Sequence, residues 1–116
     1  MSREAGARAE RQAEEFLRER GLRMLARNFR TRFGEIDLVA QDGETVVFVE
    51  VRSRSSDAFG TPQETVTLAK RRRIIRTALA YAQSRSLDAP LRFDVVAISP
   101  QGTLHIPAAF DATGAA

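Results

Sequence analysis

Residues 34–52 read GEIDLVAQDGETVVFVEVR, and this segment decides how the chain is expected to fold. It contains two runs rich in β-branched residues, Glu35–Ala40 and Thr45–Arg52, joined at Asp42-Gly43, a dipeptide typical of two-residue hairpin turns. The runs are apolar except where they carry acids, and an arginine stands two residues after the last acid. A buried carboxylate without a counter-charge is costly, so acids in such strands require a cation close by.

The hairpin predicts which of these side chains share a face. If Asp42-Gly43 forms the whole loop, Asp37 faces Phe48 and Glu35 faces Glu50. Side chains alternate across a strand, so one face is expected to carry Glu35, Asp37, Phe48, Glu50 and Arg52. The other face is expected to carry Ile36, Leu38, Val47, Val49 and Val51. Asp37 and Glu50 are then diagonal neighbours within reach of a common ion.

Two interpretations of these acids compete. In the first, the hairpin lies at the surface, and its acids are solvated or paired with Arg30, Arg32 or Arg52. The apolar run Val46–Val49 favours a central hairpin that is covered on both faces. In that case a hard divalent cation such as Mg²⁺ is one candidate counter-charge, because such ions take oxygen ligands from one or two carboxylates, with waters and phosphate oxygens completing the coordination.

The composition is that of one soluble globular domain, with 116 residues, 43% apolar and 28% charged. The absence of cysteine excludes a disulfide framework and cysteine-ligated metal sites. The sequence has no apolar run of about 18 residues and no signal-peptide pattern, so a cytoplasmic protein without a membrane span is expected. It also lacks a glycine-rich phosphate loop, which argues against a nucleotide-fuelled enzyme.

The charges form three blocks. Residues 1–34 hold nine Arg and five acids, residues 35–64 hold seven acids and two Arg, and residues 65–116 hold seven basic residues and three Asp. The blocks describe either a solvated surface or an acidic centre between basic arms, which would suit a polyanion held over a metal site. Seventeen of the eighteen basic residues are Arg, and Lys70 is the only Lys.

The predicted order of elements is α-β-β-β-α-β. Besides the hairpin, the elements are expected at residues 4–20 (helix), 22–30 (strand), 65–85 (helix) and 91–98 (strand), with a short edge strand at 103–106. One α/β domain over residues 1–107 is therefore expected. A flexible C-terminal tail is expected over residues 108–116, which are rich in Ala, Gly and Thr.

An Asp followed by Glu-x-Lys on the neighbouring strand, within this order of elements, is the pattern of the restriction-endonuclease-like PD-(D/E)xK nuclease superfamily. The chain more narrowly resembles the YraN-like family of small bacterial proteins, which are similar to archaeal Holliday-junction resolvases. The motifs that carry this resemblance are Gly6-x-x-Ala9-Glu10-x-x-Ala13, Arg27-Asn28, Gly34–Leu38, Phe48–Val51, Lys70 and Arg92–Val96. The resemblance implies a central mixed sheet flanked by helices.

The resemblance also implies roles for single residues. Asp37 and Glu50 correspond to the metal-binding carboxylates, which implies Mg²⁺ or Mn²⁺ as the cofactor. Glu10 corresponds to an acid that helps to hold the metal or its water, although it could equally be one solvated acid of the first helix. Arg52 stands in the place of the catalytic Lys. Because Arg stays charged in proteins, it suits a phosphate better than it suits the role of general base.

Basic residues around this site are expected to contact phosphates, which would position a duplex without reading its sequence. The predicted phosphate contacts are Arg52, Arg54, Lys70, Arg71 and Arg73. Lys70 opens the second helix, and it is either a solvated helix residue or a partial substitute for the missing strand Lys.

These features together predict a metal-dependent endonuclease that hydrolyses phosphodiester bonds in DNA, in preference to RNA, with branched or structured DNA as the substrate. One alternative is a non-catalytic nucleic-acid-binding module that keeps the nuclease fold. Another is a scaffold whose basic helix contacts a protein partner. The likeness to resolvases, which act as dimers on junctions with two equivalent strands, also admits a homodimer.

Overall fold

The computed structural model describes residues 3–54 and 61–116 and confirms the α/β class and the α-β-β-β-α-β order, to which it adds a full fifth strand. The elements are α1 (Arg3–Glu19), β1 (Arg23–Thr31), β2 (Gly34–Asp42), β3 (Thr45–Ser53), the short 3₁₀ helix η1 (Pro62–Thr65), α2 (Leu68–Ser84), β4 (Leu91–Ser99) and β5 (Gly102–Phe110). Neither helix in the described part of the chain is long and apolar enough to cross a membrane.

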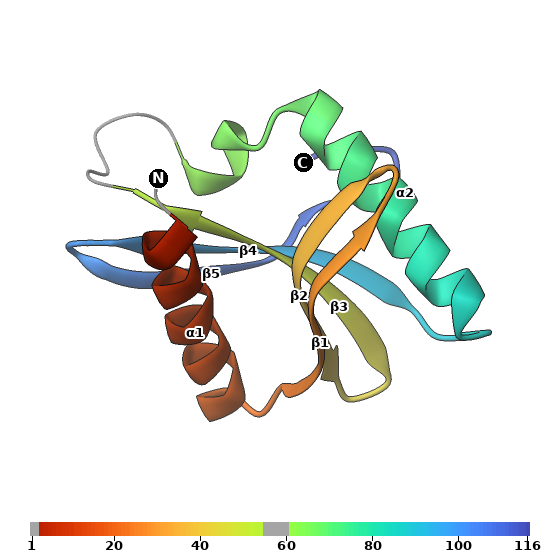
Figure 1. Ribbon diagram of the computed structural model, residues 1–116, viewed down its shortest axis with the longest axis horizontal. Coiled ribbons are helices and arrows are strands. Elements are labelled where there is room, and N and C mark those ends of the chain that lie inside the picture. The colour runs from red at the N-terminus through yellow and green to blue at the C-terminus, as the bar shows by residue number, and fades with distance from the viewer. Residues whose placement is uncertain (1–2, 55–60) are drawn as a thin grey trace.

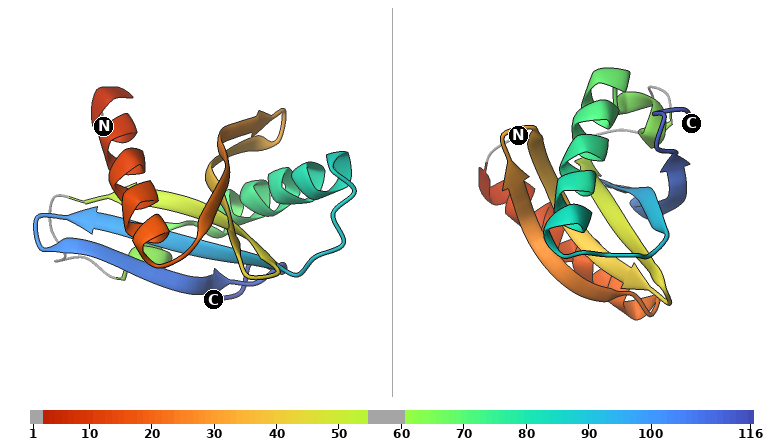
Figure 2. Two further views of the ribbon diagram at one scale, coloured as in Figure 1. Left: turned by 90° about the horizontal axis from the view of Figure 1, so that it is seen from below. Right: turned by 90° about the vertical axis from the view of Figure 1, so that its right-hand side faces the viewer.

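The five strands form one mixed sheet in the order β1-β2-β3-β4-β5. All neighbours are antiparallel except β3 and β4, which are parallel. Parallel neighbours need a crossover connection, and α2 supplies it between β3 and β4. Figure 1 shows α1 and α2 lying apart, with strands of the sheet between them. Figure 2 shows the β1–β2 hairpin standing at a steep angle to β4 and β5.

The two helices cover opposite faces of the sheet. Successive side chains of β3 and β4 point alternately to these two faces, so both strands contribute to the core under each helix. The core under α2 contains Val46, Phe48, Phe93, Val95, Ile74, Ile75, Ala78 and Tyr81, among other residues. The core under α1 contains Val47, Val49, Val96, Ile98, Ala9, Ala13 and Leu17, among other residues. The central strands are therefore buried on both sides, as the apolar run in β3 predicts.

Aromatic rings cross the sheet under α2. The rings of Phe48 and Phe93 stack with centroids 5.8 Å apart, and Phe93 stacks on Phe110 at 5.3 Å. Tyr81 of α2 meets Phe48 and Phe29 edge-on, at 5.7 and 5.1 Å. Each such pair contributes about 1 kcal/mol beyond the area it buries. The row fixes α2 against strands from both ends of the sheet.

The predicted hairpin register is wrong by one residue on each strand. Asp42 pairs with Thr45, so the loop is Gly43-Glu44, and Leu38 lies opposite Val49. Gly43 has a φ of +60°, and Glu44 is not among the residues with positive φ, which is the pattern of a type II′ turn. Glycine therefore takes the first turn position instead of the second. The shift keeps Asp37 and Glu50 on one face and brings them closer together.

The course of β2 explains a second difference. Its ladder with β3 runs from Leu38 to Asp42, while its ladder with β1 continues to Gly34. The strand thus leaves β3 before Leu38 and bends away with β1. Ile36 consequently packs in the core under α2, instead of sharing a face with Leu38.

Glu35 moves away from Glu50 for the same reason. Its Oε1 lies 3.4 Å from Nε of Arg30 and accepts a hydrogen bond from Asn28 at 3.2 Å. The predicted repulsive pair of Glu35 and Glu50 therefore does not form.

The C-terminal segment contains a longer strand than predicted. Strand β5 runs to Phe110, which is buried and stacked on Phe93. The carbonyl of Gly114 accepts a hydrogen bond of 2.9 Å from Arg71 of α2. Most residues of this segment are small, but Phe110, its one aromatic residue, anchors it to the core.

Asp94 of β4 is fully buried and holds β4 and β5 together. Its carboxylate accepts two hydrogen bonds of 2.9 Å from Arg92, one of 3.0 Å from the N–H of Ala108, and lies 2.7 Å from Nε2 of His105. Burial opposes ionisation, but the hydrogen bonds from His105 and Arg92 outweigh it and keep the pKa of Asp94 below its usual value. Arg92 also donates to Asp42, so the network reaches β2.

Asp94→Asn is expected to lower the free energy of unfolding by about 3 kcal/mol, because it leaves the buried partners of a charged network without their counter-charge. The matched control is Asp88→Asn, which changes an exposed aspartate in the loop before β4. Urea unfolding of both variants measures the difference. Equal midpoints for the two variants would show that the Asp94 network does not stabilise the fold.

Candidate active site

The position where β2 parts from β3 places Asp37 beside Glu50. Asp37 is the last residue of β2 before its ladder with β3 begins. Its Oδ2 accepts a hydrogen bond of 2.8 Å from the backbone N–H of Val51 in β3. In a continuous ladder, a backbone carbonyl of β2 would accept this N–H of Val51. Here the Asp37 carboxylate accepts it and bridges the opening between the two strands.

Glu50 is the most buried acid of this site, with 6% of its side chain exposed. Nζ of Lys70 lies 3.0 Å from its Oε2. The same oxygen is buried and receives no hydrogen bond of good geometry. Glu50 Oε2 therefore has a positive charge nearby but no directed donor, which leaves it available to a cation.

The two acids cannot both be ionised easily. Burial, and next the neighbouring Glu50 carboxylate, raise the pKa of Asp37 to about 9, with a smaller contribution from Glu10. The hydrogen bond from Val51 opposes this rise without cancelling it. Like charges at such short range favour retention of a proton unless a cation takes its place. The two carboxylates together therefore favour the binding of either a proton or a cation.

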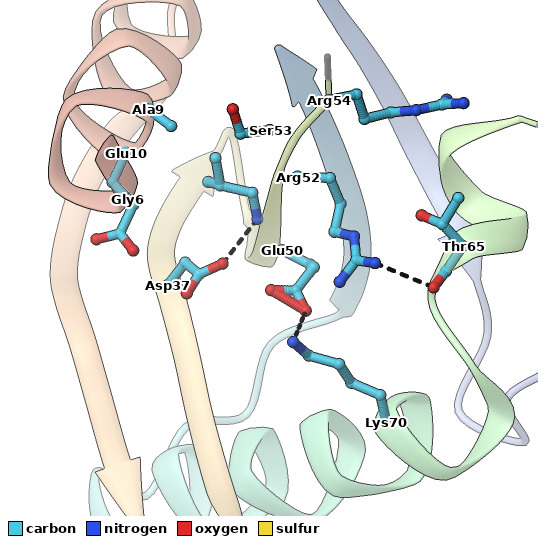
Figure 3. Close-up of a pocket in the computed structure, with 11 residues that line it drawn as sticks. Gly6, Ala9, Glu10, Asp37, Glu50, Arg52, Ser53, Arg54, Thr65 and Lys70 are labelled. Atoms are coloured by element: carbon cyan, nitrogen blue, oxygen red, sulfur yellow. Dashed lines mark hydrogen bonds and ion pairs between the residues drawn. The ribbon is translucent and has the colours of Figure 1, made fainter. Parts of the chain in front are cut away.

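The acids lie in a pocket of about 400 Å³ between the two helices. The residues that line it are Gly6, Ala9, Glu10, Asp37, Glu50, Val51, Arg52, Ser53, Arg54, Thr65 and Lys70. Figure 3 shows Asp37 and Glu50 side by side at its centre, with Glu10 coming from α1 and Lys70 from α2. Six of the eight residues predicted for the site thus surround one cavity.

The two strand arginines lie on the side of the pocket near η1. Arg52 is half-buried, and its Nη2 donates a hydrogen bond of 3.2 Å to the carbonyl of Thr65. Arg54 also lines the pocket, and its side chain points away from the two acids in Figure 3. Arg52 is thus engaged in joining β3 to η1 while its remaining N–H groups face the pocket region.

Glu10 reaches the pocket from α1, but another residue holds its carboxylate. Nδ2 of Asn28 donates to Oε1 of Glu10 at 2.8 Å and to Glu35 at 3.2 Å. Asn28 has a φ of +50° within β1, a conformation that asparagine tolerates better than most residues. This role of Asn28 is not among the predictions from the sequence, although Arg27-Asn28 is one of the motifs that carry the resemblance.

The two remaining predicted phosphate contacts lie outside the pocket. Arg71 donates to the carbonyl of Gly114 at 2.9 Å, and its guanidinium lies 5.5 Å from the ring centre of Phe110. It therefore fastens α2 to the C-terminal segment. Arg73 has an exposed side chain, and its Cβ lies next to Gly34 at the β1–β2 turn.

The donor set fits a hard divalent cation. Within the described residues, no three histidine, aspartate or glutamate side chains gather closely enough to hold a metal by themselves. Mg²⁺ needs only one or two carboxylates when waters and phosphate oxygens supply the other ligands. Asp37 and Glu50 meet this need, and Oε2 of Glu50, which accepts no hydrogen bond of good geometry, would have to exchange its ion pair with Lys70 for the metal.

The pKa of Asp37 predicts how stability depends on pH. A raised native pKa means that the native state binds this proton more tightly than the unfolded chain does. Its stabilising contribution is complete below the usual value of 3.8 and is lost as the pH rises through about 9. In EDTA, the Tm of the protein is thus expected to fall between pH 6 and pH 9 relative to the Tm of Asp37→Asn.

Asp94, whose pKa is lowered, contributes a stability that rises with pH at low pH. Because both proteins contain Asp94, this contribution cancels when their Tm values are subtracted. Asn at position 37 can still accept the hydrogen bond from Val51. Thermal unfolding followed by circular dichroism gives both curves. Parallel curves across this range would show that the Asp37 carboxyl titrates normally. Adding Mg²⁺ at pH 9 is expected to raise the Tm of the wild type and not that of the variant.

Comparison with known proteins places the chain in a family. Residues 9–98 match the family model described as "Uncharacterised protein family UPF0102". The chain is 46% identical over 107 residues to a UPF0102 protein of Persephonella marina, which covers 91% of this chain and 92% of the relative. It is 52% identical over 101 residues to a UPF0102 protein of Symbiobacterium thermophilum, which covers 86% of each. The matched segment includes β2, β3 and α2, so the chain belongs to the family UPF0102.

Proposed function

We propose that this protein is a metal-dependent endonuclease of the PD-(D/E)xK type that hydrolyses phosphodiester bonds in branched or otherwise structured DNA. The observation that carries the proposal is that Asp37 and Glu50 lie side by side in one pocket, at the point where β2 leaves β3. Two carboxylates in one pocket, with cationic side chains on its walls, suit a divalent ion that is shared with a phosphate.

Five of the charged residues that line the pocket have a role in this proposal. Asp37 and Glu50 would hold Mg²⁺ or Mn²⁺, which supplies Lewis-acid chemistry at the phosphate when it is bound. Glu10, held by Asn28, would orient a water at the edge of the pocket. Arg52 and Arg54 would bind phosphate oxygens, where a guanidinium makes strong charge-assisted hydrogen bonds.

The charge distribution favours a nucleic acid as the substrate. The acids lie in the depth of the pocket, and Arg52, Arg54 and Lys70 line it as well. Arg73 is exposed on α2, in the first half of the helix that carries Lys70. Contacts of this kind bind the backbone without reading bases, which suits recognition by DNA structure.

A second candidate function follows from one observation on Arg52. It occupies the position of the superfamily's Lys and donates to the carbonyl of Thr65. A chain without a working Lys could bind nucleic acid without cutting it. In that case DNA binding would persist without divalent ions and would fall with salt, at a slope of about 0.9 per phosphate contact on logarithmic scales.

The cleavage test uses four-way junction, nicked, duplex and single-stranded DNA with Mg²⁺ or Mn²⁺. Asp37→Asn and Glu50→Gln are each expected to lower the cleavage rate at least about 100-fold, a loss typical of removing one electrostatic stabiliser from an active site. Both changes preserve side-chain size and remove a charge from the proposed ligand pair.

The matched controls are Asp88→Asn and Glu44→Gln, which remove the same charges from exposed positions outside the pocket. They are expected to cut at the wild-type rate. If the wild type cuts none of these substrates but binds DNA without a metal ion, the nuclease proposal is wrong. The non-catalytic nucleic-acid-binding module is then the better account. Cleavage that survives Asp37→Asn and Glu50→Gln would refute this site and suggest a contaminating nuclease.

A further inference from the structure

The only lysine of the chain enters the site from a helix. Lys70 belongs to α2, and its Nζ lies 3.0 Å from Oε2 of Glu50. Its side chain is 38% exposed, whereas that of Glu50 is 6% exposed. The ammonium group therefore stands between a buried carboxylate and the solvent-filled pocket (Figure 3).

The start of α2 fixes the stem of this lysine. Thr67 caps the helix, and its side chain accepts a hydrogen bond of 3.2 Å from the backbone N–H of Lys70. Ile74 and Ile75 bury the following turn in the core under α2. The backbone of Lys70 is thus held firmly, while its four-carbon side chain remains free to move its charged end.

A lysine in the first turn of a helix is electrostatically unfavourable, because the positive end of the helix dipole lies there. The first turn of α2 contains no acid that could offset this. The carboxylate that compensates Lys70 is Glu50 on the neighbouring strand. The contact with Glu50 in the pocket therefore explains the position of Lys70 better than a place on the exposed surface of α2 does.

Arg52 contrasts with Lys70 in its surroundings. Its guanidinium donates to the Thr65 carbonyl, whereas no described hydrogen bond or ion pair joins it to Asp37 or Glu50. Lys70, in contrast, makes a direct ion pair with Glu50, one of the two proposed metal ligands.

We propose that Lys70 is the catalytic lysine of this site, supplied by α2 in place of strand β3. In the metal-free protein it neutralises Glu50. With a divalent ion held by Asp37 and Glu50, the ammonium of Lys70 would no longer be needed to neutralise Glu50 and would instead bind an oxygen of the phosphate. This inference rests on the proposed function and adds the residue that binds the phosphodiester at the point of cleavage.

The test compares Lys70→Met with Arg72→Met. Both changes remove one positive charge from α2, but residues two positions apart on a helix point in nearly opposite directions. Arg72 is exposed and does not line the pocket. Measurements on the whole protein are Mn²⁺ affinity by electron paramagnetic resonance, duplex affinity in Ca²⁺, and cleavage in Mg²⁺.

Lys70→Met is expected to bind Mn²⁺ at least about threefold more tightly, because the competing charge beside Glu50 is gone. Its DNA affinity in Ca²⁺ is expected to fall about tenfold, as the loss of a charged hydrogen bond predicts. Its cleavage rate is expected to fall about 100-fold. Arg72→Met is expected to match the wild type in all three measurements.

Lys70→Arg guards against a folding defect, since it keeps the charge and is expected to keep wild-type Mn²⁺ affinity and measurable DNA binding in Ca²⁺. A Lys70→Met protein that binds Mn²⁺ more weakly, or behaves like Arg72→Met, would overturn the role of Lys70 and leave the nuclease proposal standing. A wild type that binds no Mn²⁺ would overturn both. A wild type that binds Mn²⁺ but cuts no DNA would also overturn both.

Discussion

The parting of β2 from β3 is the constraint on which the rest of this structure depends. Two strands that stay paired satisfy each other's backbone groups and leave no room between them. Here the ladder stops at Leu38, and the Asp37 side chain accepts the N–H of Val51. The same bend carries Ile36 into the core under α2 and moves Glu35 toward Asn28. One break in strand pairing therefore opens the pocket, supplies its first acid and removes a competing acid from it.

The remaining parts of the fold keep this opening rigid. The aromatic row from Phe29 to Phe110 holds α2 against the sheet, and so fixes the helix start from which Lys70 extends. The core under α1 holds the helix that carries Glu10. The Asp94 network lies at the other strand pair and stabilises β4 against β5 without contacting the pocket. The two buried acids therefore differ. Both carboxylate oxygens of Asp94 accept hydrogen bonds, whereas Oε2 of Glu50 has only the ion pair with Lys70.

The sequence predicts the element order and the meeting of Asp37 with Glu50 because both depend on local patterns. Alternation in β3 and the hairpin signal suffice for them, even with the register wrong by one residue, since the shift on both strands preserves the shared face. It does not predict the bend of β2, which goes together with the long-range packing of Ile36 and Phe29 under α2. Nor does it predict the anchoring of Phe110 in a segment of small residues, or the amide of Asn28 between two acids. Each of these contacts joins residues whose spacing in the chain carries no periodic signal.

The position of the lysine has a physical consequence for a site of the proposed kind. A lysine two residues after Glu50 would be bound to the same strand face as the metal ligand, so its distance from the ion would be set by the strand. A lysine on α2 is fixed at its backbone by Thr67 and reaches Glu50 across the pocket on a flexible four-carbon side chain. Under the proposed function, its charge would neutralise Glu50 in the absence of the ion and would bind the phosphate in its presence. Arg52, relieved of that task, can remain bonded to Thr65 and close the η1 side of the pocket. An arginine at position 52 is on this view the result of a division of labour between strand and helix, and is not in itself a sign of lost activity.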